Sequence, residues 1–173
     1  MKTLPRFPLS RAGRITLGIL LVLVALFFFA KVRYAGHAPV KLRAEECDPH
    51  LWRHVYEKDR LRTIEECTAV EGRVVSLGRA EDGDLHIALD PENKSVLNLV
   101  NAIHTHGHLV VEVVCEHVPD GADEKAACAD FYSQITVPNI GDRVRITGAY
   151  VTDRDNGWNE IHPVTRIEIL SSR

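Results

Sequence analysis

The sequence predicts an all-β domain of five strands with a few short helices, preceded by one N-terminal transmembrane helix. Two observations predict the β domain: apolar and polar residues alternate over several separate runs, and turns rich in glycine and aspartate separate those runs. An uncharged apolar run near the N-terminus predicts the membrane helix. The 173 residues suffice for one domain with a core and for this additional segment.

The N-terminal region predicts a single-pass membrane anchor. Residues 1–14 are basic and contain no acid, and residues 15–30 contain no charge. At about 1.5 Å per residue the apolar run spans about 24 Å. Flanking basic side chains that reach the membrane interface extend the expected anchor to residues 15–34. A cleaved signal peptide is the alternative, with "GHA" at 36–38 as the best cleavage site.

The basic N-terminal flank places the N-terminus in the cytoplasm and the body of the protein outside it. We therefore expect a single-pass membrane protein whose globular domain is extracytoplasmic. Its expected segments are a cytoplasmic N-terminus at 1–14, an anchor at 15–34, a linker at 35–46 and a domain at 47–173.

Four cysteines form two local couples, and export makes disulfide bonds possible for them. Three pairings are formally possible. We expect Cys47 to pair with Cys67 and Cys115 with Cys128, because each couple brackets one predicted helical segment. Four buried thiols are the alternative. A metal site made by these cysteines is disfavoured, because no C-x-x-C spacing occurs.

The domain begins with a predicted helix. Asp48 is a suitable N-cap, Pro49 suits the first helical position, and apolar residues then recur at helical spacing to about Lys58. A second short helix, with Cys128 near its end, is predicted within residues 119–132.

Five runs follow the two-residue period of a β-strand. In the second run, Leu85, Ile87 and Leu89 alternate with more polar neighbours, so one face is apolar. The last two runs are joined by a turn whose Asp, Asn and Gly residues tolerate left-handed backbone, which predicts a hairpin over 148–164. Pro163 lacks an amide donor and is expected at a bulge or an unpaired edge position. The predicted strands are 67–77, Asp84–Leu89, Leu109–Cys115, Arg143–Val151 and 158–170.

The order of these elements is three strands, a helix and two strands, with a glycine in the first strand and another in the fourth. This is the order of a five-stranded Greek-key barrel of the OB-fold (oligonucleotide/oligosaccharide-binding) type. The sequence therefore predicts an OB-fold-like barrel. Another small barrel or sandwich with the same number of strands is the alternative.

Two blocks carry a resemblance to known proteins, "RLRTIEECTAVEGRVVSLGRAEDGDLHIAL" and "GDRVRITGAYVTDRDNGWNEIHPVTRIEIL". They resemble a group of exported or membrane-anchored bacterial proteins of unknown function with an OB-fold-like domain. The resemblance covers roughly residues 47–170, and its most specific elements are "DGDLHI" and "GWNEIHPV". It implies the barrel fold and export, and it brings no activity, cofactor or catalytic residue.

The charge of the domain disfavours nucleic acid as a partner. Beyond residue 30 the chain carries 17 basic and 24 acidic residues, and no basic cluster follows residue 43. Such a surface repels a phosphate backbone. We therefore expect the membrane as a partner through residues 15–34, an envelope protein as a possible second one, and no nucleic acid.

Barrels of this type bind ligands on the outer face of strands two and three, beside the loops that join strands one to two and four to five. The sequence places a strongly acidic set there. Its members are Asp82, Asp84, His86, Glu112, Asp153, Asp155, Trp158, Glu160 and His162. We take six of them as ligand-binding candidates: Asp84, His86, Glu112, Trp158, Glu160 and His162.

No cofactor is predicted, although carboxylates with imidazoles could hold a divalent metal ion. The other interpretation of His86 and His162 is structural, as hydrogen-bonding residues that fix the hairpins. A second, weaker metal candidate consists of His104, His106 and His108, whose alternate spacing would place them on one side of an extended strand. A solvated loop is the alternative for these three.

The preferred functional hypothesis is a membrane-anchored extracytoplasmic module that binds a small molecule, a glycan or a protein. No nucleophile motif or phosphate-binding loop is evident, so a non-catalytic role is favoured. One alternative is a metal-dependent hydrolase on the same barrel, with Glu160 as a base. The other is a structural component of an envelope complex.

Overall fold

The structure, a computed structural model, describes residues 40–172. The predicted N-terminal segments up to residue 39, the membrane anchor among them, lie outside the described residues. Within the described part of the chain, no helix is long and apolar enough to cross a membrane.

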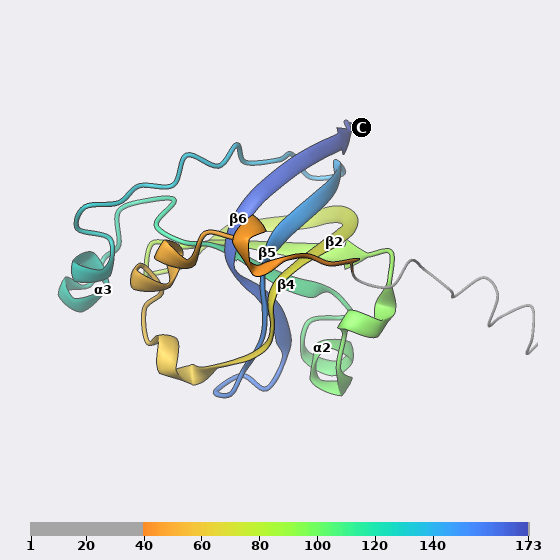
Figure 1. Cartoon of the computed structure of the whole chain (residues 1–173), viewed down its shortest axis with the longest axis horizontal. Helices are drawn as coiled ribbons and strands as arrows, with labels where there is room; N and C mark the ends of the chain where they lie inside the picture. The colour runs from red at the N-terminus through yellow and green to blue at the C-terminus, as the bar shows by residue number, and fades with distance from the viewer. Residues whose placement is uncertain (1–39, 173) are drawn as a thin grey trace, which may run out of the picture. The chain divides into compact units, whose positions relative to one another are not determined.

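The described chain is mostly β structure in one mixed sheet, with a few short helices (Figure 1). The strands are β1 (Val40–Lys41), β2 (Leu61–Arg79), β3 (Leu85–Pro91), β4 (Leu109–Val113), β5 (Arg143–Asp153) and β6 (Asn159–Ser171). Their order is β1-β2-β3-β4-β6-β5, and β2 also pairs with β5. Each of the five long strands therefore has at least two hydrogen-bonded neighbours. The predicted mostly-β class with five main strands is confirmed.

One parallel pairing matters most for the candidate site. β4 and β6 run parallel and meet at Val110 with Glu160 and at Val111 with Ile161, whereas every other strand pair described is antiparallel. Residue 112 therefore lies directly beside the first residues of β6, although about 50 residues of chain separate the two strands. This pairing brings together side chains from both strands on each face of the sheet.

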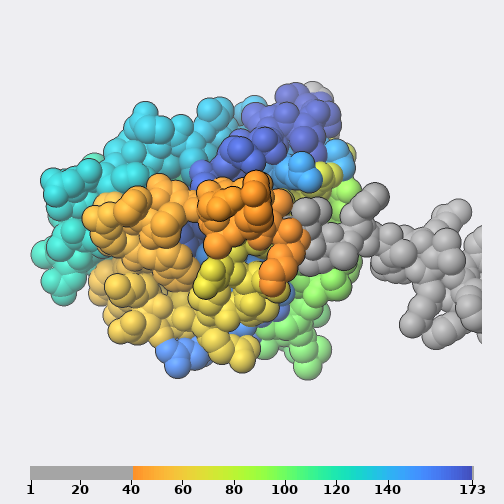
Figure 2. All heavy atoms as spheres, in the orientation of Figure 1, coloured from red at the N-terminus to blue at the C-terminus, as the bar shows by residue number. Residues whose placement is uncertain are grey.

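The apolar core fills one face of these strands, as the predicted alternation requires. Its fully buried members include Ile87, Leu89, Leu109, Val111, Val144, Ile146, Ile161 and Val164. The opposite faces of β3, β4 and β6 carry ionisable side chains, and the segment that precedes β2 crosses over the strands (Figure 1). Figure 2 shows residues 40–60, in orange to yellow, over much of the face of the molecule seen there.

The short helices are η1 (Ala44–Glu46), η2 (Pro49–Arg53), η3 (Lys58–Arg60), η4 (Lys94–Val96), α2 (Leu99–His104) and α3 (Ala122–Ala127). The prediction of one helix to Lys58 is wrong: η2 and η3 are separate 3₁₀ turns. The cap is as expected, because Asp48 accepts a hydrogen bond from the His50 amide at 2.8 Å. The helix cannot continue through Glu57, whose φ of 47° is left-handed.

Both predicted disulfides are confirmed. Cys47 pairs with Cys67 at an S–S distance of 1.98 Å, and Cys115 pairs with Cys128 at 2.02 Å. The first bridge joins the segment before η2 to β2, and the second joins the end of β4 to the end of α3. The described residues contain no free cysteine.

The β5–β6 hairpin has an irregularity at Pro163, as predicted. The register shifts between the pairs Gly148 with Val164 and Tyr150 with Ile161, so Pro163 falls within the shift. Gly148 lies very close to the opposing strand there. A β-carbon on Gly148 would stand 2.5 Å from the Pro163 carbonyl oxygen and 2.7 Å from Ile161 Cγ2.

Gly148→Ala is therefore expected to lower the free energy of unfolding by about 1 to 3 kcal/mol, because strand backbone must move to admit the methyl group. Chemical denaturation measures the change. Gly78→Ala in β2 is the matched control, since a β-carbon there meets nothing within 4 Å. Equal effects of the two substitutions would show that the close approach at Gly148 does not constrain the hairpin.

Candidate functional site

Six ionisable side chains gather on the face of β3, β4 and β6 that is turned away from the apolar core. We call them the buried charge cluster: Arg60, Asp84, Glu112, Asp153, Glu160 and His162. Its five members other than Arg60 are each at most 2% exposed. Charged groups are almost never buried in this way unless they are paired or bind a ligand.

His162 lies at the centre of the cluster, between three carboxylates. Its Nδ1 is 2.8 Å from Glu112 Oε2 and 3.2 Å from Glu160 Oε1. Its Nε2, on the other side of the ring, is 3.5 Å from Asp84 Oδ2. His162 follows Glu160 by two residues in β6, so the strand period puts both on one face. Glu112 reaches them through the parallel β4–β6 pairing.

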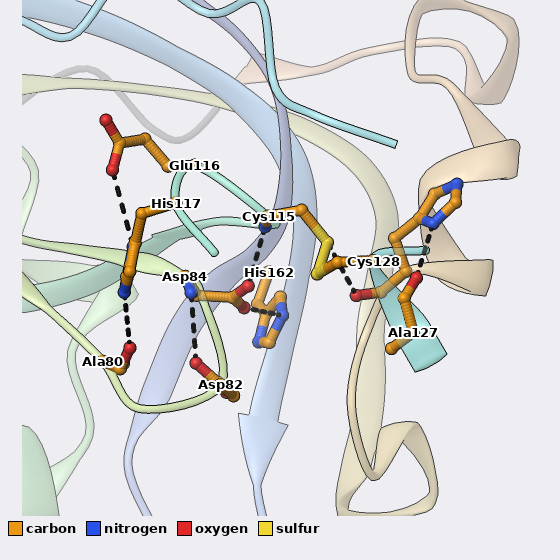
Figure 3. Close-up of a disulfide and its surroundings, with 10 residues drawn as sticks. Ala80, Asp82, Asp84, Cys115, Glu116, His117, Ala127, Cys128 and His162 are labelled. Atoms are coloured by element: carbon orange, nitrogen blue, oxygen red, sulfur yellow. Dashed lines mark hydrogen bonds and ion pairs between the residues drawn. A yellow bond between two sulfur atoms is a disulfide. The ribbon is translucent and has the colours of Figure 1, made fainter. Parts of the chain in front are cut away.

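Asp84 lies immediately before β3 and is held by two hydrogen bonds. Its Oδ1 accepts a hydrogen bond from the Cys115 amide at 2.9 Å, and its own amide donates to Asp82 Oδ1 at 3.2 Å. Figure 3 shows the Asp84 carboxylate between Cys115, which is disulfide-bonded to Cys128, and the His162 ring. The second oxygen, Oδ2, has no hydrogen-bond partner among the described residues and points to His162.

Arg60 separates the cluster from solvent. Its guanidinium is 2.5 Å from Asp153 Oδ2, 3.7 Å from Glu112 Oε2 and 3.9 Å from Glu160 Oε1. The Arg60 side chain is 15% exposed and also lines an open hollow of about 500 Å³. The other residues around this hollow are Glu57, Asp59, Arg154 and Asp155. Among residues 40–172, Arg60 is the one that belongs to both the hollow and the cluster.

Two partly exposed aromatic side chains lie at the edge of the cluster. His86 Nε2 is 3.3 Å from Glu112 Oε1. The Trp158 indole donates a 2.8 Å hydrogen bond to Glu160 Oε2. Trp158 is therefore held against a buried carboxylate. Stacking on a ligand would favour an indole that stands free in solvent, and Trp158 does not.

Burial and mutual attraction set the pKa values of the cluster. Burial lowers the pKa of His162, but Glu112, Asp84 and Glu160 outweigh it and raise that pKa well above its usual value. Burial would raise the pKa of Glu112, but His162, His86 and Arg60 lower it to about 2. Burial raises the pKa values of Asp84 and Glu160, and His162 opposes it in both. The centre of the cluster is thus an ion pair of His162 with Glu112.

Three of these residues have the donor set of a metal site. Asp84, Glu112 and His162 each offer one ligand atom, and these atoms lie within 4.8 Å of one another. Among the described residues, no other group of three His, Cys, Asp or Glu side chains lies close enough together to share an ion. Asp84 Oδ2, Glu112 Oε2 and His162 Nε2 are also buried there without a hydrogen-bond partner of good geometry.

No protein-family model matches the chain, and no curated protein matches it.

The structure brings all six ligand-binding candidates into one place. Asp84, Glu112, Glu160 and His162 are members of the cluster, His86 contacts Glu112, and Trp158 contacts Glu160. The expectation that they form an exposed face is wrong for the four cluster members, which are buried. Their covering comes from Arg60 and from the loop that carries the Cys115–Cys128 bridge.

The second metal candidate, the three loop histidines, does not form an extended clip. His104 ends α2, and the chain then turns through His106 and Gly107, both at positive φ. The amides of Thr105 and Gly107 both donate to the Asn101 carbonyl, which closes the helix end. Side chains on a tight turn do not share one side as they would on a strand. His104 and His106 are exposed, in keeping with a solvated loop.

Arg60 is the member of the buried charge cluster that the sequence did not single out. It precedes β2 in the chain and carries no local pattern that distinguishes it from its charged neighbours. The signal that could have found it is charge balance: a set of buried carboxylates requires a cation nearby.

Proposed function

We propose that this protein is a non-catalytic, extracytoplasmic binding module that holds a small cationic ligand in the buried charge cluster. In this proposal residues 15–34 anchor it in the membrane, and the five long strands form an OB-fold-like Greek-key barrel. The pairing of β2 with both β3 and β5, and the parallel β4–β6 pair, support that barrel. Its outer face on β3 and β4 is where such barrels bind ligands.

The observation that carries the proposal is the excess of carboxylates in the cluster. Among the described residues, the four carboxylates of Asp84, Glu112, Asp153 and Glu160 face two basic side chains within the cluster, those of Arg60 and His162, with the partly exposed His86 at its edge. Like charges held this close and away from water repel one another strongly. Burial is the main cause of the raised pKa values of Asp84 and Glu160, and a neighbouring carboxylate adds to it in each case, Asp82 for Asp84 and Glu112 for Glu160. A bound cation would balance the excess.

Burial supports a small ligand over a glycan or a protein. The carboxylates of the cluster are at most 2% exposed, so a large ligand could not contact them without displacing covering segments. The same burial disfavours the hydrolase, because a substrate must reach the reacting group. An ion or a very small organic cation could pass Arg60 from the adjacent hollow.

Two features support the location outside the cytoplasm. Disulfides persist in oxidising compartments, and the domain has two. The sequence resemblance to exported or membrane-anchored bacterial proteins points the same way.

The test is thermal unfolding of the full chain, purified in mild detergent, at constant ionic strength. The added cations are Zn²⁺, Mn²⁺, Ca²⁺, Mg²⁺, methylammonium and methylguanidinium. A ligand at 100 times its Kd stabilises the folded state by about 2.7 kcal/mol, so the melting temperature rises measurably. We expect at least one cation to raise it in the wild type and to fail in Glu112→Gln.

Glu81→Gln is the matched control, because Glu81 is exposed and lies outside the cluster. It should respond to cations as the wild type does. The proposal is wrong if no cation raises the melting temperature, or if Glu112→Gln responds as strongly as the wild type.

A further inference from the structure

We infer that the ligand of the buried charge cluster is a divalent first-row transition-metal ion, ligated by Asp84, Glu112 and His162. This inference rests on the proposed binding function and names the class of its ligand. It uses one imidazole nitrogen and two carboxylates, a donor set that suits Zn²⁺ or Mn²⁺.

The spacing of the ligand atoms suits one small ion. His162 Nε2 and Asp84 Oδ2 are 3.5 Å apart. Two ligands bound to Zn²⁺ at about 2.1 Å with a tetrahedral angle would stand about 3.4 Å apart. Glu112 also belongs to this group of three, whose ligand atoms lie within 4.8 Å of one another. Its Oε2 now pairs with Nδ1 at 2.8 Å, so this carboxylate would have to swing round the ring toward Nε2 to become the third ligand. A water molecule could occupy a fourth position.

The same atoms lie in ion pairs but lack well-formed hydrogen bonds. Asp84 Oδ2, Glu112 Oε2 and His162 Nε2 are buried and make no well-formed hydrogen bond in the described part of the chain. Leaving such groups unsatisfied in the interior destabilises the folded state, and more so when they are charged. Asp84 Oδ2 and His162 Nε2 face each other at 3.5 Å without a well-formed hydrogen bond, and a shared ion explains this better than a defect of packing.

Outer residues hold the ligands as they do in established metal centres. Glu160 Oε1 lies 3.2 Å from His162 Nδ1, so it can accept that nitrogen's proton and leave Nε2 free to bind a metal. Glu160 is itself held by the Trp158 indole. On the opposite side, the Cys115 amide fixes Oδ1 of Asp84 and directs Oδ2 toward His162. The first coordination shell is therefore oriented before an ion arrives.

The donor set also discriminates between ions. Ca²⁺ prefers six to eight oxygen ligands and Mg²⁺ keeps several waters, and neither demand suits a buried site with one imidazole. Zn²⁺ and Mn²⁺ accept nitrogen and oxygen donors together. The excess of negative charge in the cluster favours a divalent ion over a monovalent one.

The experiment measures metal content and affinity in the full chain, purified in detergent with its disulfides intact. The chain is stripped with chelator, loaded separately with Zn²⁺, Mn²⁺ or Ca²⁺, passed through a desalting column and analysed for metal. We expect about one Zn²⁺ or Mn²⁺ per chain and no retained Ca²⁺. Titration with Zn²⁺ then gives the Kd of each variant.

Three variants make the test specific. Asp84→Asn removes a ligand while keeping its shape, and should raise the Kd for Zn²⁺ by more than about 100-fold, since removing an outer partner alone costs 10- to 100-fold. Glu160→Gln, which removes the outer partner of His162, should raise it about 10- to 100-fold. Asp130→Asn changes an exposed carboxylate that follows α3 in the chain, and it should leave the Kd for Zn²⁺ unchanged.

Each outcome decides the inference. Retained metal with this ranking of variants supports it. Absence of retained Zn²⁺ and Mn²⁺, or equal affinities in Asp84→Asn and Asp130→Asn, overturns it. If an organic cation stabilises the wild type but no metal is retained, the binding function stands and only the metal is wrong. If no cation binds at all, both proposals fall.

Discussion

His162→Ala is expected to lower the free energy of unfolding by about 3 to 5 kcal/mol, which is the usual loss when one partner of a buried ion pair is removed. The imidazole is fully buried and lies between Asp84, Glu112 and Glu160. Without it, these carboxylates face one another across a cavity with less positive charge to separate them. Urea denaturation of metal-free protein near pH 7 measures the difference.

His104→Ala is the matched control, because His104 is exposed at the end of α2. It should change the stability by no more than about 0.5 kcal/mol. Adding Glu112→Gln to His162→Ala should recover part of the loss, because it removes one of the repelling charges. A loss no greater than that of the control would mean that His162 does not hold the cluster together.

Arg60→Ala is expected to cause the second largest loss of stability. The same substitution should strengthen the binding of a cation. Arg60 is partly exposed, so we expect a loss of stability of about 2 to 3 kcal/mol, less than for a fully buried pair. The loss of its positive charge beside Asp153, Glu112 and Glu160 makes the cluster more attractive to a cation. The Kd for the bound cation should therefore fall.

Arg62→Ala is the control for Arg60, since Arg62 is an exposed arginine two residues further along the chain. Denaturation gives the stability of each variant, and titration with Zn²⁺ gives its affinity. If Arg60→Ala binds Zn²⁺ more weakly than Arg62→Ala does, Arg60 does not act as the internal competitor of a bound cation.

The strand alternation and the cysteine pairing could be predicted from the sequence because both depend on local patterns. In β3 the apolar positions Leu85, Ile87 and Leu89 repeat every second residue, and they form part of the core. The same period puts His86 on the other face, where it contacts Glu112. The two disulfides follow from cysteines that lie only 20 and 13 residues apart in the chain.

The first part of β2 could not be predicted in this way. The expected strand begins at Cys67, whereas β2 begins at Leu61. Arg62, Thr63 and Glu66 are exposed, so that stretch shows no apolar face. It is a strand because it pairs with β5, from Leu61 opposite Asp153 onward. Such a long-range pairing overrides a weak local pattern.

The burial of the candidate site also depends on contacts that are distant in sequence. The set of acidic and histidine residues could be named from strand faces and loop positions. Their enclosure could not, because it requires the β4–β6 pairing, the Arg60 side chain and the Cys115 amide. Residues that alternate on a strand were expected to face solvent, and here another layer of chain covers them.

The most direct test of the account is anomalous X-ray diffraction from crystals of the protein grown with Zn²⁺. The account predicts a strong zinc peak in the buried charge cluster, about 2.0 to 2.2 Å from Asp84 Oδ2 and His162 Nε2, with a Glu112 oxygen as a third ligand. The contrary result is a cluster without a zinc peak, in which Asp84 and His162 hydrogen-bond directly to each other. The cluster would then be a structural ion-pair network.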